Sequence, residues 1–202
     1  MKFLEKEIKN SPLFGLNKSD SIQSLQMDAI KEFNRNGLPD KNWEDWKYSD
    51  FSSLNNMSFR FGPRKNISAL PNQFPSIHNS NRIVFFNGHY QKDLSSISNK
   101  VSIETIDETY KQNPDLIHKI FSPNTNPFHN INSAMINTGL TIIINDNEIV
   151  NKPIHIINYT SDIDEPTMNH PLFIIKIGRG SEASIIEHYY GSTNIEYWLN
   201  VV

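Results

Sequence analysis

The chain has 202 residues, of which 37% are hydrophobic, and a formal net charge of −3 at pH 7. This size suits one large domain or two small ones, and the charge gives no reason to expect nucleic acid or an anionic membrane as a partner. The sequence contains no cysteine, which excludes disulfides and thiolate ligands for zinc or an iron–sulfur cluster from this chain. We find no apolar run suited to a signal peptide or a membrane helix, so the expected compartment is the cytoplasm.

The chain begins with two predicted helices. Residues 1–9 have the apolar content of one short helix. A longer amphipathic helix is expected over residues 20–35, with a cap at Ser19 or Asp20. Its apolar residues recur close to helical spacing: Ile22, Leu25, Met27, Ile30 and Phe33. We interpret this stripe as core rather than as a groove for a partner.

Three aromatic residues follow a helix stop. Gly37 and Pro39 would end the long helix and keep it from resuming. Trp43, Trp46 and Tyr48 then lie among charged residues, and each ring can bury apolar area while its polar atom reaches a partner. We expect a docking loop in which all three rings are largely buried between the N-terminal helix and the β region. A ligand- or base-stacking site is the alternative, which the lack of a basic run disfavours.

The clearest strand in the first half is Arg82–Phe86, which runs into the turn dipeptide Asn87-Gly88. Its continuous apolar run is typical of a strand buried on both faces. The preceding segment, residues 54–80, is rich in Asn, Ser and Pro. It predicts a loop with one short extended piece at residues 57–61.

The second half turns from helices to strands. We expect a strand over residues 101–106, a helix over 107–121 that Pro114 interrupts, and a helix over 127–135. Short apolar or alternating runs then recur from Gly139 onward, over residues 140–144, 153–159, 172–177, 183–190 and 195–202. This spacing is typical of a sandwich, a barrel or a β-solenoid, and it does not choose among the three.

A six-residue motif surrounds the aromatic loop: Leu38, Pro39, Glu44, Trp46, Lys47 and Tyr48. It resembles the N-terminal signature of SufD in the SufB/SufD family, whose members belong to the SufBCD iron–sulfur cluster assembly complex. Ser49 stands where the family has threonine, while Asp40 and Lys41 depart from the pattern on a surface turn.

Later segments resemble the same family in the same order. The matching landmarks are Asn87, Gly88, Asn132 and Glu187. His170-Pro171 is a further landmark, but Leu172 replaces the arginine that usually follows it. The resemblance therefore covers the chain from about residue 20 to its end, and it assigns these residues a structural role in the family motifs.

The resemblance implies an α+β fold in two parts. Residues 1–138 would form a small helical and mixed N-terminal domain. Residues 139–202 would form the first rungs of a right-handed parallel β-helix. Since the sequence stops on an apolar strand with no polar cap, we expect it to be a truncated, N-terminal half of a SufD-like chain.

The family's role implies a non-catalytic scaffold subunit of the iron–sulfur cluster assembly machinery. Such a subunit pairs with a SufB-like subunit and acts with a SufC-like ATPase, through contacts that lie mostly in the missing C-terminal half. A homodimer is a further expectation, and nucleic acid and membrane are not expected partners. The whole complex handles the iron–sulfur cluster, and no cofactor is expected on this chain.

Two other functions remain as alternatives. One is a SufB-like paralogue, although the N-terminal signature favours SufD. The other is a β-solenoid carbohydrate-active enzyme, which would need a pair of carboxylates on one face and would normally be secreted.

Other motifs that suggest chemistry are weak. The seven histidines form no ligand pair on one predicted element, so we expect no metal site. Gly178–Ala183 superficially fits a dinucleotide loop, but the residues after it are strand-like, and a phosphate would lack a helix N-terminus. We expect a turn there, and we expect no catalytic, cofactor-binding or metal residue in the chain.

Overall fold

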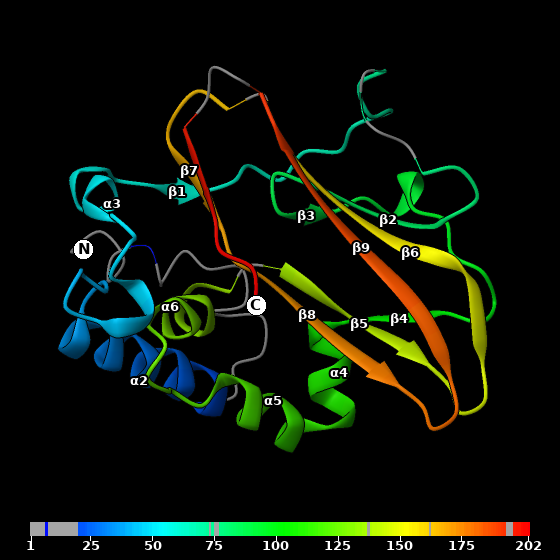
Figure 1. Cartoon of the computed structure of the whole chain (residues 1–202), viewed down its shortest axis with the longest axis horizontal. Coiled ribbons are helices and arrows are strands. Elements are labelled where there is room, and N and C mark those ends of the chain that lie inside the picture. Colours follow the sequence, from blue (N-terminus) through cyan, green and yellow to red (C-terminus); the bar gives the residue numbers. More distant parts are fainter. Residues whose placement is uncertain are drawn as a thin grey trace.

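The computed structural model describes residues 7, 20–72, 74, 77–136, 138–161, 163–192 and 196–202. The helix expected over residues 1–9 and the proposed cap at Ser19 lie outside these residues, apart from Glu7. The described chain combines helices with three β-sheets, as the α+β expectation required (Figure 1).

The helices are α2 (Asp20–Asn36), α3 (Ser52–Asn56), α4 (Ile106–Gln112), α5 (Pro114–Phe121) and α6 (Pro127–Met135), with 3-10 turns η2 (Glu44–Trp46) and η3 (Lys92–Leu94). The strands are β1 (Arg60–Phe61), β2 (Asn81–Phe86), β3 (His89–Tyr90), β4 (Ser102–Thr105), β5 (Thr138–Ile144), β6 (Ile149–Thr160), β7 (Thr167–Asn169), β8 (Pro171–Ile177), β9 (Glu182–Gly191) and β10 (Tyr197–Leu199).

Local chemistry fixes the helix ends that the sequence predicted. At the end of α2, Gly37 takes a φ of +73° and donates its N–H to the carbonyl of Phe33 at 2.7 Å. Helices α4 and α5 break at Pro114, as expected, because proline has no N–H to continue the ladder. Thr105 and Glu108 form a capping box at the start of α4, and Asn113 caps α5.

From residue 138 onward, the chain runs through the three sheets twice in the same order. We call each run a pass. The first pass makes β5, β6 and β7, and the second makes β8, β9 and β10. Each strand pairs in parallel with the strand of the other pass, and its partner lies about 30 residues further along the chain. The sheet orders are β1-β7-β10, β3-β2-β6-β9 and β4-β5-β8, so earlier strands extend all three sheets.

The right-handed parallel β-helix that the resemblance implied is not shown. The three sheets are separate, and none closes on itself. Two passes supply only one such parallel pair to each sheet, which is too little to define a solenoid. The division at residue 138 stays a prediction, since β2 and β4 pair across it with β6 and β5.

The hairpin signal at residues 87 and 88 is confirmed. Asn87 and Gly88 both have positive φ, at 48° and 78°, and they join β2 to β3. Strand β2 is buried on both faces, with only Arg82 exposed. The sequence did not reveal β7 or α3, because these elements are too short to give a periodic pattern.

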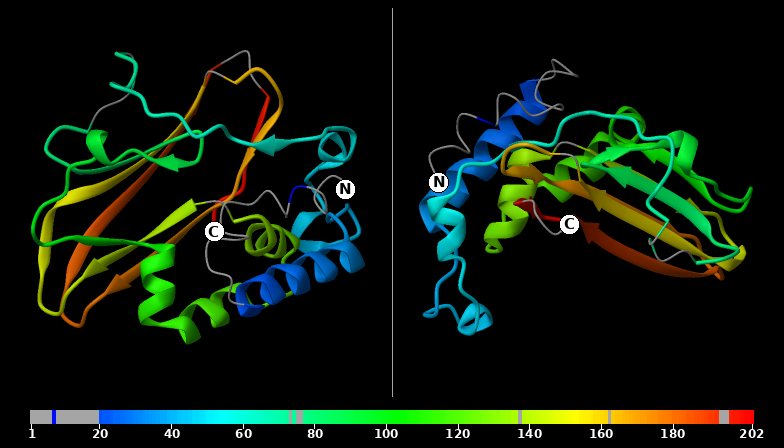
Figure 2. Two further views of the ribbon diagram at one scale, coloured as in Figure 1. Left: turned by 180° about the vertical axis from the view of Figure 1, so that it is seen from behind. Right: turned by 90° about the horizontal axis from the view of Figure 1, so that it is seen from above.

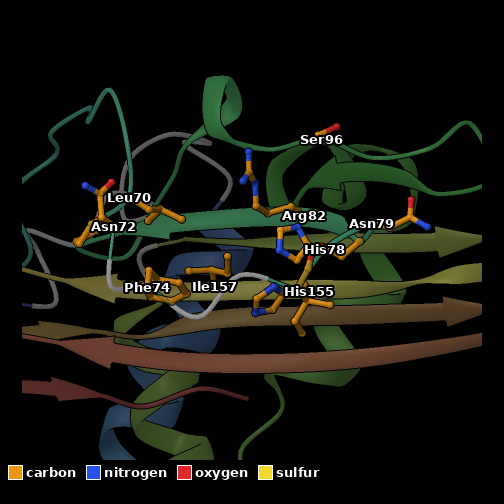
Figure 3. A pocket seen from close by; sticks show the side chains of 12 residues that line it. Leu70, Asn72, Phe74, His78, Asn79, Arg82, Ser96, His155 and Ile157 are labelled. Carbon is orange, nitrogen blue, oxygen red and sulfur yellow. The ribbon is translucent and has the colours of Figure 1, made fainter.

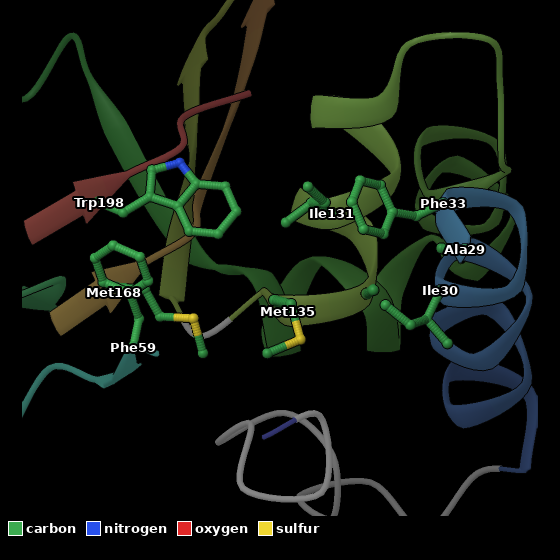
Figure 4. Packing of buried hydrophobic residues seen from close by; sticks show 9 residues of the cluster. Ala29, Ile30, Phe33, Phe59, Ile131, Met135, Met168 and Trp198 are labelled. Atoms are coloured by element: carbon green, nitrogen blue, oxygen red, sulfur yellow. The ribbon is translucent and has the colours of Figure 1, made fainter. Parts of the chain in front are cut away.

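One hydrophobic cluster joins the helices to the sheets (Figure 4). Its members are Ala29, Ile30 and Phe33 from α2, Ile131, Ala134 and Met135 from α6, Phe59, and Met168 and Trp198 from β7 and β10. Helix α6 therefore lies between α2 and the short strands, and the helices gather at one side of the sheets (Figure 2). A second cluster fills the space between β5 and the β2–β6 pair.

Candidate interaction site

The loop between α2 and α3, residues 37–51, carries most of the SufD-like motif. Leu38 is half-buried against the helical cluster, and Pro39 is buried. Asp40 accepts the N–H of Asn42 at 2.8 Å, so a short turn leads the chain into η2. The contacts of Leu38 fix the start of the loop on the helical part of the molecule.

Trp46 is the residue that docks this loop. Its ring lies 5.5 Å from that of Phe51 and 5.1 Å from that of Phe128 on α6, and the latter two rings are 4.9 Å apart. Tilted and edge-on contacts of this kind stabilise by more than the buried area alone. Trp46 therefore fastens the loop to α6, which supports the docking interpretation for this ring.

The expectation that all three aromatic rings are largely buried is wrong. Trp43 and Trp46 are only half-buried, and Tyr48 is 92% exposed. Lys47 lies beside it: Lys47 Nζ is 2.5 Å from Glu44 Oε1 and 5.3 Å from the centroid of the Tyr48 ring. The loop thus buries one side and presents tyrosine and lysine on the other.

A shallow cleft of about 530 Å³ runs along this loop, lined by residues 38–41 and 47–52. Its charged groups include Lys41, Lys47 and Asp50, and the backbone and hydroxyl of Ser52 hold the pKa of Asp50 below its usual value. An exposed tyrosine beside mixed charges is typical of a surface that binds protein, because the ring adds apolar area at low entropic cost.

Removal of the Trp46 ring should affect stability much more than removal of the Tyr48 ring. Trp46→Ala should lower the free energy of unfolding by about 2 kcal/mol, since it removes two ring contacts and buried area. Tyr48→Ala should change it by less than about 0.5 kcal/mol, as expected for an exposed side chain. Urea unfolding followed by tryptophan fluorescence and by circular dichroism measures both, and equal losses would contradict this division of roles.

Three other motif landmarks meet at the bend between β7 and β8. Asn132 on α6 is buried and donates from Nδ2 to the carbonyls of Pro171 and Asn200, at 2.9 and 2.8 Å. Gly88 packs directly against the side chain of Asn169. His170, at the centre of the bend, is fully buried. These landmarks are spread along the sequence from residue 88 to residue 170, and the fold brings them to one corner.

Asn87 closes the neighbouring turn. Its side chain exchanges two hydrogen bonds with the backbone of Ser161, donating to the carbonyl at 2.9 Å and accepting from the N–H at 3.0 Å. Both residues are buried. Like Asn132, Asn87 satisfies backbone groups where a strand ends, so the structure gives it a fastening role.

Glu187 and His188 lie on opposite faces of β9, as alternation along a strand requires. Glu187 is exposed and accepts a hydrogen bond from the hydroxyl of Tyr189, whose pKa is raised by burial and by that bond. His188 instead packs on Phe74, with ring centroids 5.5 Å apart. The ten motif residues thus lie in three places: the loop, the β7–β8 bend with its neighbouring turn, and β9.

Buried histidines make stability depend on pH. Burial lowers the pKa of His170 from 6.5 to about 3, and it also lowers the pKa values of His89 and His155. Below pH 6.5 the unfolded chain binds protons that the folded chain excludes, so the free energy of unfolding should fall as pH drops from about 6.5 toward 3. Urea unfolding at a series of pH values checks this.

A substitution isolates the contribution of His170. The variant His170→Asn keeps an acceptor near Asn200, which lies 3.4 Å from His170 Nδ1, but removes the titrating ring. Its stability should fall less steeply with decreasing pH than that of the parent protein. A slope identical to that of the parent would show that another group carries the effect.

Sequence reasoning missed one cluster of residues. Arg82 on β2 and His155 on β6 are register partners, and His155 lies beside His188 on β9 with ring centroids 5.5 Å apart. The histidines looked scattered because they are far apart along the chain. Parallel register places them side by side, and only knowledge of that register could have revealed it.

The candidate sites are surfaces and fastening points. Within the ranges that the structure describes, no three His, Asp or Glu side chains are grouped so that they could hold a metal ion. No helix in the described part is long and apolar enough to cross a membrane. In the described part of the chain, helices join partly wound parallel strands, and the loop between α2 and α3 exposes a tyrosine.

Comparison with known families identifies the chain's relatives. Residues 9–156 match the family described as SufBD protein N-terminal region. The chain therefore belongs to the SufBD family. It is 26% identical over 161 residues to an iron–sulfur cluster assembly SufBD family protein of Synechocystis sp.. That match covers 75% of this chain and 35% of the relative, so the chain spans about a third of the relative's length.

Proposed function

We propose that this chain is the N-terminal part of a SufD-like, non-catalytic scaffold subunit that acts in iron–sulfur cluster assembly. In this proposal it pairs with a SufB-like subunit and works with a SufC-like ATPase, and the cluster is cargo of the whole complex. Support comes from the family match and from the name of the Synechocystis relative. The six motif residues of the loop favour SufD over SufB.

The observation that carries the proposal is the parallel winding of the strands. The last residues continue it, since Val202 donates its N–H to the carbonyl of Pro171 at 3.4 Å and accepts the N–H of Phe173 at 2.9 Å, along the edge of β8. A third pass thus begins where the second did. We infer that the two passes are the first coils of a parallel β-helix, right-handed as such crossovers nearly always are.

Exposed apolar residues fit this interpretation. Strands β8 and β9 are the last of their sheets and expose Ile175, Ile177 and Tyr189, at 39%, 52% and 44%. Apolar side chains along an open strand edge favour the addition of another strand. In a longer protein, further coils would cover them and form a stiff rod, which would relay closure of the ATPase to the subunit interface.

Co-purification from the native host tests the proposal. A tag is placed on the gene at its own locus, and the intact mass of every recovered protein is measured. We expect a SufB-like protein and a SufC-like ATPase in fixed ratio to the tagged chain. Sedimentation of the purified protein alone then tells whether it also forms a homodimer.

Two results would overturn the proposal. Recovery of a SufD-like partner would indicate that this chain is the SufB-like subunit of the pair. Recovery of the chain alone, together with normal activity of iron–sulfur enzymes in a strain that lacks the gene, would remove it from cluster assembly altogether.

A further inference from the structure

A pocket of about 520 Å³ lies on the outer face of the β2–β6–β9 sheet, beside residues 70–72, 74 and 77–80 (Figure 3). Leu70, Phe74 and Ile157 give it an apolar wall, and the basic side chain of Arg82 and the imidazole of His155 also line it. We call it the Arg82–His155 pocket. No residue of the SufD-like motif lines it, so its role is independent of the proposed scaffold function.

The fold holds Arg82 in place at the pocket wall. Its backbone N–H and carbonyl bond to Ser96, and its Nε donates to the carbonyl of Leu94 at 2.9 Å. These bonds fix the base of the guanidinium. In the described part of the chain, its two Nη groups make no hydrogen bond or ion pair, so the charged end is available to a ligand.

His155 lies directly beside Arg82 in register and is only 1% exposed. Its Nε2 is buried and has no hydrogen-bond partner among the described residues. Burial, together with the nearby His188 and Arg82, lowers the pKa of His155, so the ring is neutral at pH 7 and carries one N–H. A buried polar nitrogen without a partner is costly, and a polar ligand atom that displaces the side chains covering Nε2 would relieve that cost.

The charges around the pocket favour a ligand of negative charge. Among its described lining residues Arg82 is a basic side chain, and none is Asp or Glu. A guanidinium presents its Nη donors in a fork that matches the oxygens of phosphate or carboxylate. The apolar wall of Leu70, Phe74 and Ile157 suits a ring or a hydrocarbon chain beside that anionic group.

We propose that the Arg82–His155 pocket binds a small organic oxyanion, with its phosphate or carboxylate on Arg82 and His155 and its apolar part against Phe74 and Leu70. Such a site requires both features at once. Phenyl phosphate and benzoate carry both, inorganic phosphate has only the anion, and benzyl alcohol has only the ring.

Isothermal titration of the whole chain with these four probes tests the proposal. We expect saturable binding of phenyl phosphate or benzoate, at least about tenfold tighter than that of inorganic phosphate or benzyl alcohol. Arg82→Gln should weaken the binding of these aromatic anions at least about tenfold, since it removes a charged hydrogen-bond donor. Arg179→Gln is the matched control, because that side chain is 96% exposed on a distant turn, and it should leave binding unchanged.

A second measurement covers the case in which Arg82→Gln fails to fold. The ring signals of His155 in nitrogen-15 spectra should shift on addition of phenyl phosphate, with the pKa of His155 rising as the anion approaches. Saturable binding with that shift supports the site. No saturable binding, equal loss in the Arg179→Gln control, or binding without any change at His155 would overturn it.

Discussion

Asn132→Asp should destabilise the folded chain by about 3–5 kcal/mol at pH 7, although it replaces a single NH₂ by an oxygen. The native Nδ2 donates to two buried carbonyls, those of Pro171 and Asn200. A carboxylate in its place would face both oxygens with negative charge and no donor. Because this bond set joins α6 to the β7–β8 bend, the loss should appear as cooperative unfolding at lower urea concentration.

The pH dependence of this loss of stability separates the effect of the introduced negative charge from the effect of the changed side-chain shape. Protonation restores one donor to the introduced carboxyl group, whose pKa the site should raise above the usual value of about 3.9. The difference in stability between variant and parent should therefore shrink as pH falls below that raised pKa. Asn99→Asp, at an exposed position, is the control and should cost less than about 0.5 kcal/mol. Similar losses of stability in both variants would refute the role given to the hydrogen bonds of Asn132 at the β7–β8 bend.

Gly88→Ala is expected to cost about 3 kcal/mol, the second large effect. Gly88 has a φ of +78°, where any Cβ is strained, and an added Cβ would also lie 2.6 Å from the Cγ of Asn169. Asn169 is buried at the β7–β8 bend and cannot move aside without disturbing it. The variant should therefore unfold at lower urea concentration and lower temperature than the parent protein.

Gly37→Ala provides a matched control for this steric argument. Gly37 has nearly the same φ, +73°, but nothing lies within 4 Å of an added Cβ. It should show only the backbone cost of about 1 kcal/mol. The excess loss in Gly88→Ala then measures the contact with Asn169, and the absence of any excess would mean that the bend is loosely packed.

The sequence predicted elements whose signals are local. Helix α6 was expected at residues 127–135 and occurs there, because Asn126 and Pro127 mark its start. The break at Pro114 and the hairpin at Asn87 and Gly88 were predictable for the same reason: each depends on one residue's own backbone preference.

The sequence could not tell which way the aromatic rings of the loop point. Trp46 packs on Phe128, a residue more than eighty positions away, whereas Tyr48 faces solvent. The sequence alone led us to expect both rings to be buried and to anchor the loop. Their difference depends on where α6 lies, and this is a long-range property that no local pattern encodes.

The candidate sites divide in the same way. The motif residues were found from the sequence, but their meeting at the β7–β8 bend depends on how strands pair. The Arg82–His155 pocket was missed entirely, since its residues come from β2, from β6, from Ser96 and from residues 70–72, 74 and 77–80. Parallel register brings them together, and a continuous apolar run such as that of β2 lacks the alternation of a single buried face that would specify its register.

The regular spacing between paired strands also bears on how the chain folds as it is made. Each strand of the second pass meets a partner that was synthesised about 30 residues earlier, and such modest separations favour rapid pairing. A strand leaving the ribosome therefore finds its template already present, and order can spread from the N-terminal side toward the C-terminal side. On this view β2 acts as a seed for β6 and β9, β4 for β5 and β8, and β1 for β7 and β10.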